Sequence, residues 1–197
     1  MATEVRSDGS LDRLQQNFFL PLQLLAIPWM VEIIDQAFFR GQLVFVVIPR
    51  ALIGIPGIFL SAISHANFSH LIGNSISFAI FSWIILAKSR KDYWATLLLG
   101  WLGGGLACWL FGFSPAHGLS GVVYSLFGYL LLIGWLEKRF IPLLISVFVL
   151  VQYSYVIWGV LPTAPGVAWW GHLYGFLIGA FAAYGVYREP GHLHTPD

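Results

Sequence analysis

Charge is scarce in this chain of 197 residues. Only 10% of the residues are Asp, Glu, Lys or Arg, whereas 58% are hydrophobic, and the mean hydropathy is +0.77. Soluble domains carry about 25% charged residues, so a water-soluble globular fold is nearly excluded. Basic and acidic residues almost balance at a net charge of +1, and no basic cluster is present. We therefore expect no nucleic-acid partner.

Cysteine is rare as well, and acidic residues are missing from most of the apolar segments. The single cysteine, Cys108, excludes an internal disulfide, and we interpret it as a small core or lipid-facing residue. Residues 51–87, 93–136 and 140–187 contain no carboxylate at all. A triad with a buried acid therefore cannot be assembled from these three segments.

What is abundant is long uncharged sequence, in the tracts 14–31, 51–87, 93–136 and 140–187. A helix needs about 20 apolar residues to cross ~30 Å of hydrocarbon. Gly- and Pro-containing breaks at 112–118 and 159–166 divide the last two tracts into two spans each. The sequence thus predicts an all-α, polytopic membrane protein, a bundle of six transmembrane helices near 18–38, 66–87, 93–112, 118–135, 140–158 and 169–187.

The positions of the basic residues predict how this bundle is oriented. Eight of the ten Lys and Arg fall on one side of the predicted spans, which places both termini in the cytoplasm. We expect residues 1–17 to form a cytoplasmic tail without a cleaved signal peptide, 18–187 to form one six-helix domain and 188–197 to form a second cytoplasmic tail. The connection 39–65 is expected to lie in the interface or against the bundle.

Polar residues gather at the outer ends of predicted spans two, four and six. His70 and Asn74 are four residues apart, so they share one helix face. Ser120 and Tyr124 have the same spacing, and span six opens with His172. Together they supply a nucleophile, a base and hydrogen-bond donors, which acyl transfer requires. Taken singly, each has a structural explanation as a helix-backbone, core or interhelical hydrogen-bonding group.

Small residues predict close contact between spans four and six. Residues of this kind let two helix backbones approach each other, and here they recur along both spans. Such an approach would bring His172 toward Ser120, although an ordinary packing seam would use the same residues. The small residues are Gly171, Gly175 and Gly179 in span six and Gly121, Ser125 and Gly128 in span four.

The order and spacing of these residues resemble the rhomboid family of intramembrane serine proteases. The resemblance rests on His65-x4-His70-x3-Asn74, Gly118-Leu119-Ser120-Gly121-Val122-Val123-Tyr124 and Gly171-His172-Leu173-Tyr174-Gly175-x3-Gly179. It implies that Ser120 is the nucleophile and His172 the general base and later acid. It also implies that His70, Asn74 and the Ser120 backbone amide bind the oxyanion, with Tyr124 against the His172 ring and Gly118, Gly121 and Gly175 in support.

The resemblance further implies an endopeptidase that hydrolyses a peptide bond in or near the outer end of a substrate's transmembrane helix. The expected partners are single-pass transmembrane proteins and the lipid bilayer, and no cofactor or metal ion is expected. We expect a multi-pass protein of a bacterial cell (inner) membrane. Glu32 and Asp35 are the only candidates for a third catalytic member, and we expect them to be solvated at the interface instead.

Two alternatives follow from the same residues. A catalytically inactive rhomboid-like protein would bind membrane proteins without cutting them, although the presence of both Ser120 and His172 favours an enzyme. A small transporter or channel would also use intramembrane His and Asn residues and broken helices. A transporter predicts a path open to both sides, whereas a protease predicts a cavity closed at one end.

Overall fold

The computed structural model describes residues 5–162 and 166–190, with side chains from Leu11 onward. The remaining parts of the predicted tails, residues 1–4 and 191–197, lie outside the described residues. Within the described part the regular structure is helical, apart from one antiparallel bridge between Val47 and Ala116. The all-α prediction is confirmed.

The helices follow the order of the six predicted spans. The first continues into a π-helical turn, the third contains one, and the connection after the first holds one short helix between two 3-10 turns. In chain order they are α1 (Val5–Ile34), η1 (Asp35–Phe39), η2 (Leu52–Gly54), α2 (Ile55–Leu60), η3 (Ser61–Ile63), α3 (Phe68–Lys88), α4 (Arg90–Leu98), η4 (Leu99–Gly103), α5 (Gly104–Phe111), α6 (Ser120–Glu137), α7 (Phe140–Gln152), α8 (Ser154–Ile157), η5 (Trp158–Val160) and α9 (Trp169–Arg188).

Four of these helical segments are long and apolar enough to cross a membrane: Leu11–Phe39, Phe68–Lys88, Arg90–Phe111 and Ser120–Glu137. The bent pair Phe140–Gln152 and Ser154–Val160 is a fifth if it is counted as one span. The remaining predicted span, α9, has 20 residues but is less apolar because it contains Gly, His and Tyr. The chain is an integral membrane protein that crosses the bilayer several times.

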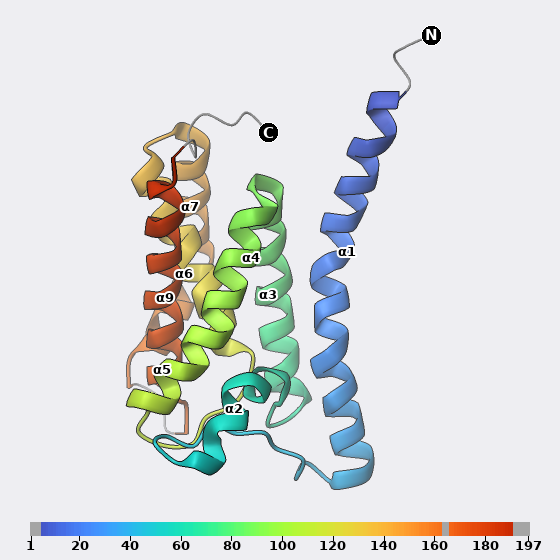
Figure 1. Cartoon of the computed structure of the whole chain (residues 1–197), viewed down its shortest axis with the longest axis vertical. Coiled ribbons are helices and arrows are strands. Elements are labelled where there is room, and N and C mark those ends of the chain that lie inside the picture. The colour runs from blue at the N-terminus through green and yellow to red at the C-terminus, as the bar shows by residue number, and fades with distance from the viewer. Residues whose placement is uncertain (1–4, 163–165, 191–197) are drawn as a thin grey trace.

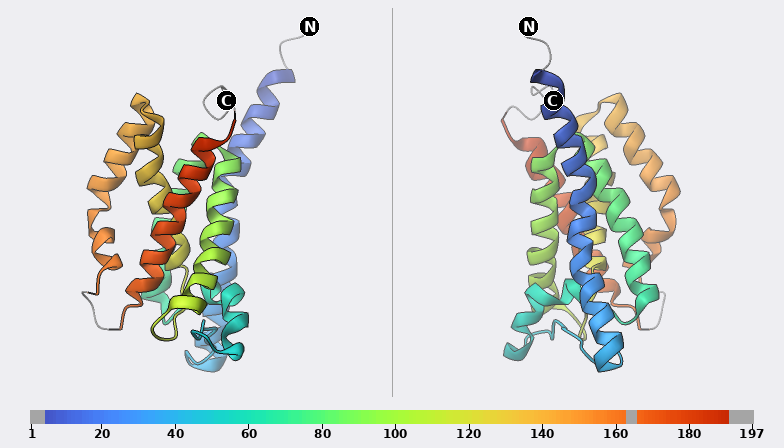
Figure 2. Two further views of the ribbon diagram at one scale, coloured as in Figure 1. Left: turned by 60° about the vertical axis from the view of Figure 1, so that its left-hand side comes forward. Right: turned by 90° about the vertical axis from the view of Figure 1, so that its right-hand side faces the viewer.

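The long helices run side by side, with α1 and α7 on opposite flanks (Figures 1 and 2). The start of α1 and the end of α9 lie at one end of the bundle, and α2 lies at the other (Figure 1). Helix α6 makes its most extensive contact with α9, α7 packs on α6, and α1 packs on α3. We call the end at which α6 begins the Ser120 end and the opposite one the Glu137 end.

The contact between α6 and α9 is as close as the small residues predict. A methyl group at Gly175 would overlap the backbone oxygen of Gly121, and one at Gly179 would overlap that of Ser125. On the other helix, a methyl group at Gly128 would overlap the backbone oxygen of Phe176. Glycine lets the two backbones touch here, and the rotational setting of α9 against α6 is fixed as a result.

Predicted span five differs from the expected single helix. It bends by 73° between α7 and α8, at Tyr153. Beyond the bend, the carbonyl of Val156 accepts a hydrogen bond from Tyr124 in α6, and the carbonyl of Gly159 lies 2.9 Å from a ring nitrogen of His172 in α9. Because these side chains draw the two carbonyls toward the bundle, the end of the span leaves the direction of α7.

The expectation that Glu32 and Asp35 are solvated is wrong. Each side chain is only 1% exposed. The connection after α1 folds back over them, so that Asp35 Oδ1 accepts the Leu43 N–H at 2.8 Å and Glu32 Oε1 accepts a hydrogen bond from Gln36 Nε2 at 2.9 Å. The prediction treated this end of α1 as free surface, whereas the connection covers it.

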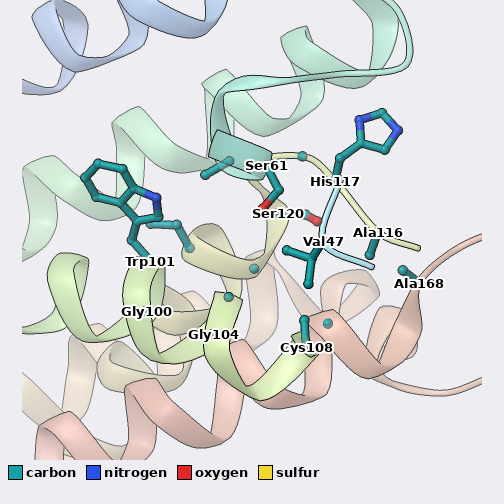
Figure 3. A pocket seen from close by; sticks show the side chains of 16 residues that line it. Val47, Ser61, Gly100, Trp101, Gly104, Cys108, Ala116, His117, Ser120 and Ala168 are labelled. Atoms are coloured by element: carbon teal, nitrogen blue, oxygen red, sulfur yellow. The ribbon is translucent and has the colours of Figure 1, made fainter. Parts of the chain in front are cut away.

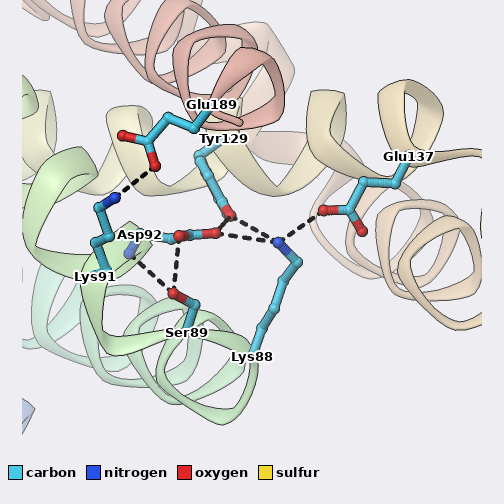
Figure 4. A network of polar contacts seen from close by, with 7 residues as sticks. All are labelled: Lys88, Ser89, Lys91, Asp92, Tyr129, Glu137 and Glu189. Atoms are coloured by element: carbon cyan, nitrogen blue, oxygen red, sulfur yellow. Dashed lines mark hydrogen bonds and ion pairs between the residues drawn. The ribbon is translucent and has the colours of Figure 1, made fainter. Parts of the chain in front are cut away.

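Charged side chains close the bundle at the Glu137 end (Figure 4). Lys88 Nζ lies 3.1 Å from Asp92 and 2.8 Å from Glu137, and the Tyr129 hydroxyl donates to Asp92. Asp92, Glu137 and Tyr129 are all buried. The network joins α3, α4 and α6 through charges that have partners inside the protein.

Candidate active site

A serine and a histidine meet where α6 and α9 begin. Ser120 is the first residue of α6, and its Oγ lies 2.9 Å from Nε2 of His172 in α9. The other ring nitrogen, Nδ1, lies 2.9 Å from the carbonyl oxygen of Gly159. A carbonyl only accepts, so the neutral ring carries its proton on Nδ1 and leaves Nε2 free to accept the Ser120 hydroxyl proton.

Tyr124 fixes the plane of the His172 ring. The two rings are stacked, with centroids 4.2 Å apart and an interplanar angle of 8°. Tyr124 itself is held because its hydroxyl donates to the carbonyl of Val156 at 2.8 Å. The imidazole is therefore oriented by stacking on one side and by the Gly159 carbonyl at Nδ1.

Next to Ser120, Gly118 makes room for two polar side chains from α3. A Cβ atom at Gly118 would lie 2.8 Å from His70 Cε1 and 3.9 Å from Asn74 Nδ2. Asn74 is 9% exposed, and its Nδ2 has no hydrogen-bond partner in the part of the chain that the structure describes. A buried amide without a partner is costly, and an oxyanion beside Gly118 would satisfy it.

Gly118 also needs its own backbone conformation. Its φ is +115°, a region that side-chain-bearing residues rarely adopt, and its N–H donates to the Ser61 carbonyl at 2.8 Å. The turn places Ser120 at the first position of α6, where a backbone N–H has no partner within its own helix. The His70 and Asn74 side chains thus lie beside Gly118, two residues before the Ser120 N–H.

A cavity opens beside this space (Figure 3). Gly104 and Cys108 border it on one side and Ser61 and His117 on the other, with Ser120 between them. Most of its lining is small, so backbone forms much of the wall. The lining residues are Val47, Ser61, Ala62, Gly100, Trp101, Gly104, Gly105, Cys108, Ala116, His117, Gly118, Ser120, Gly121, Val122, Ala168 and Gly171.

Comparison with known proteins shows to which family the chain belongs. A family model described as a rhomboid domain matches residues 54–189, which include Ser120, His172, His70 and Asn74. The chain belongs to the rhomboid family. Its match to the family begins after α1, so α1 and the first part of the following connection lie outside it.

Proteins similar to this rhomboid-family chain occur in mycobacteria. It is 31% identical to the uncharacterized protein Rv1337 of Mycobacterium tuberculosis over 174 residues, which cover 83% of this chain and 72% of the relative. It is 35% identical to the uncharacterized protein ML1171 of Mycobacterium leprae over 139 residues, 65% of this chain and 55% of that relative. These names assign no activity.

The rhomboid-type site also contains groups to which the sequence assigned no role. His65 is 2% exposed, and its Nε2 accepts the Leu119 N–H at 3.3 Å. The carbonyl of Gly159 orients His172, and the thiol of Cys108 lies beside Gly171. The position of His65 in the histidine and asparagine motif was a visible signal. Nothing in the sequence marks a particular carbonyl such as that of Gly159.

Burial keeps the two loop histidines neutral. It is the largest cause that lowers the pKa of His65, to about 3, and charges on His70 and His117 lower it further. Burial also lowers the pKa of His117, against the opposing effects of the Ser64 carbonyl and of Glu32. Among the described residues, no three His, Cys, Asp or Glu side chains converge in a way that would hold a metal ion.

Proposed function

We propose that this rhomboid-family protein is an intramembrane serine endopeptidase with a Ser120–His172 dyad. The observation that carries the proposal is the 2.9 Å contact between Ser120 Oγ and His172 Nε2, with the Nδ1 proton directed to Gly159. A neutral imidazole in this tautomer accepts the serine proton as the hydroxyl attacks a carbonyl. Gly159 has the orienting role that a carboxylate has in a triad.

The proposed reaction proceeds in two halves. Ser120 Oγ bonds to the scissile carbonyl carbon, its proton moves to His172 Nε2, and the carbonyl oxygen becomes an oxyanion beside Gly118. His70, Asn74 and the Ser120 N–H donate to that oxygen, and each such donor is typically worth ~3 kcal/mol in the transition state. His172 then protonates the leaving amine, and water, activated by His172, hydrolyses the acyl-enzyme.

The proposed substrates are single-pass transmembrane proteins of the bilayer that holds the enzyme. A peptide bond inside a helix is shielded by the helix itself, so the substrate must unwind near the end that reaches Ser120. We propose a bacterial inner membrane with both termini in the cytoplasm, so that the Ser120 end faces outward. The buried carboxylates of Asp92 and Glu137, which pair with Lys88 at the other end, support a cavity closed on the cytoplasmic side.

The test is cleavage of a reconstituted transmembrane substrate by the full chain in proteoliposomes. We expect Ser120→Ala and His172→Ala to reduce cleavage by roughly 10⁴-fold or more, since loss of either member of such a unit removes nucleophilic catalysis. Both changes should also abolish labelling of Ser120 by a fluorophosphonate.

Ser75→Ala is the matched control. Ser75 is a serine within α3 whose hydroxyl donates to the Leu71 carbonyl and accepts the indole N–H of Trp29 in α1. Neither bond involves Ser120 or His172, so its loss should leave cleavage unchanged. Equal cleavage by wild type and Ser120→Ala would refute the proposal. Binding of the substrate without any cleavage or labelling would instead identify an inactive member of the family.

A further inference from the structure

Three imidazole rings stand in a row beside Gly118. The His65 and His70 ring centroids are 5.1 Å apart, at 71°, and those of His70 and His117 are 6.5 Å apart, at 80°. Within the described part of the chain, the His70 side chain has no hydrogen-bond partner; its one bond there, to Asn67, is made by its backbone N–H. The orientation of the His70 ring therefore depends on the rings at its two sides and on Gly118.

His117 is itself held firmly. Its Nδ1 lies 3.3 Å from the Ser64 carbonyl and 3.4 Å from the Ser64 hydroxyl. Since the carbonyl only accepts, His117 carries its proton on Nδ1 and donates it. Ser64 is 1% exposed, and its hydroxyl also accepts the Phe45 N–H. The ring is thus attached to a buried part of the connection after α1.

Glu32 brings a charge to the same place. Its side chain is 1% exposed, and no cationic side chain in the described residues pairs with it. Its carboxylate acts on His117 and favours the protonated ring. Glu32 belongs to α1, which lies outside the segment that matches the rhomboid family. This electrostatic influence therefore comes from a helix outside the matched segment.

We propose that His117 is a positioning residue that holds the His70 ring in place beside Gly118. The inference rests on the proposed function, because His70 has a task only if an oxyanion forms there. His117 does not touch the reacting atoms. Its effect is to keep the donor of His70 directed at the oxyanion, so that no reorientation is needed during the reaction.

Two substitutions separate this role from that of a simple loop tether. His117→Phe keeps a ring against His70 and loses the hydrogen bond to Ser64. His117→Asn keeps a donor for the Ser64 carbonyl and loses the ring. If the ring positions His70, the Asn variant should lose kcat roughly tenfold at unchanged KM, a size typical of a misplaced supporting contact. The Phe variant should retain most of the activity.

The opposite result, with His117→Phe impaired and His117→Asn active, would overturn the proposal and identify a tether. Equal activities in the two variants, whether lost or retained, would overturn it as well. Thermal unfolding of each variant in detergent should accompany the kinetics. If a variant is destabilised, its kinetic result is not used, and the NMR measurement on the resting protein decides.

A measurement on the resting protein keeps this inference separate from the proteolytic one. NMR of the histidine ring carbons in micelles should show the His70 signals shifted or broadened in His117→Asn and close to wild type in His117→Phe. Glu32→Gln should lower the pKa of His117, since the carboxylate raises it. Unchanged His70 signals in both ring variants would refute the positioning role even if cleavage is observed.

Discussion

At the scale of single residues, backbone groups decide which ring nitrogen carries the proton in three of the described histidines. The carbonyl of Gly159 places the proton of His172 on Nδ1, and the N–H of Leu119 requires an unprotonated Nε2 on His65. The Ser64 carbonyl places the proton of His117 on Nδ1. One residue type thus supplies a base, an acceptor and a donor within a single site.

Gly118 offers a sharp test at this scale. In Gly118→Ala the new methyl group would lie 2.8 Å from His70 Cε1, and the residue would keep a φ of +115° that alanine disfavours. We expect kcat to fall roughly 10²-fold, the effect of losing one oxyanion donor, with slower fluorophosphonate labelling of Ser120. The measurement is the rate constant of labelling alongside the cleavage rate.

Gly166→Ala separates the effect of backbone strain from the effect of the overlap with His70. Gly166 also has a positive φ, of +78°, but among the described residues no atom lies within 4 Å of its added methyl group. Backbone strain alone should leave the labelling rate near that of wild type. If Gly118→Ala labels as fast as Gly166→Ala, the space beside Gly118 is not an oxyanion site.

At the scale of elements, the setting of α9 against α6 determines whether His172 reaches Ser120. The two residues lie 52 positions apart and meet only because Gly175 and Gly179 bring the helix backbones into contact. The bent end of span five completes the arrangement, since its Val156 and Gly159 carbonyls hold Tyr124 and His172.

Gly175→Ala tests this packing. The added methyl group would overlap the backbone oxygen of Gly121, so the helices must separate. We expect the free energy of unfolding to fall by ~1–3 kcal/mol, as for other overpacked positions, and labelling of Ser120 to fall with it. Unfolding in mixed SDS micelles measures the first effect.

Gly185→Ala in the same helix is the control, because no atom of the part of the chain that the structure describes lies within 4 Å of its methyl group. Alanine is a better helix former than glycine, so this change should leave labelling unaffected and stabilise the helix by up to ~1 kcal/mol. Similar losses in both variants would show that the overlap with Gly121 of α6 does not explain the result.

At the scale of the whole molecule, the segment before Ser120 is built into a layer that reaches back to α1. The N–H groups of Ala116, Gly118 and Leu119 donate to Val47, Ser61 and His65 respectively. Asp35 ties the same connection to α1 through Leu43. The nucleophile therefore stands on a segment whose backbone is bonded to a different part of the chain.

The burial of His65 in this layer predicts that the folded protein loses stability at acid pH. In the unfolded chain His65 has an ordinary pKa of about 6.5, whereas in the fold its pKa is about 3 because of burial and its neighbouring histidines. Between these values the unfolded state binds more protons, so the free energy of unfolding should decrease as the pH falls below 6.5. The limit for one such group is ~1.4 kcal/mol per pH unit.

The comparison variant is His65→Gln, whose carbonyl oxygen accepts the Leu119 N–H without titrating. Unfolding of wild type and variant in mixed micelles at pH 7.5, 6 and 5 should give a shallower decline for the variant. The carboxylates of the protein contribute equally to both and cancel in the difference. Parallel curves would show that His65 does not carry the acid sensitivity.

Composition and residue spacing were enough to predict the helical class, the order of the spans and the contact of small residues between α6 and α9. These features are encoded locally, in composition and in the spacing of residues such as Gly175 and Gly179 on one helix face. The sequence also singled out Ser120, His172, His70 and Asn74, because polar side chains are conspicuous in otherwise apolar segments.

Only the tertiary structure decided what lies between these elements. The burial of Glu32 and Asp35, the bend at Tyr153 and the places of His65 and His117 depend on where a long connection and a span end come to rest. The carbonyl of Gly159 acts on His172 from another span, 13 positions away. Every residue carries a carbonyl, so the amino-acid sequence contains no sign of which one will orient a side chain, and folding alone makes that choice.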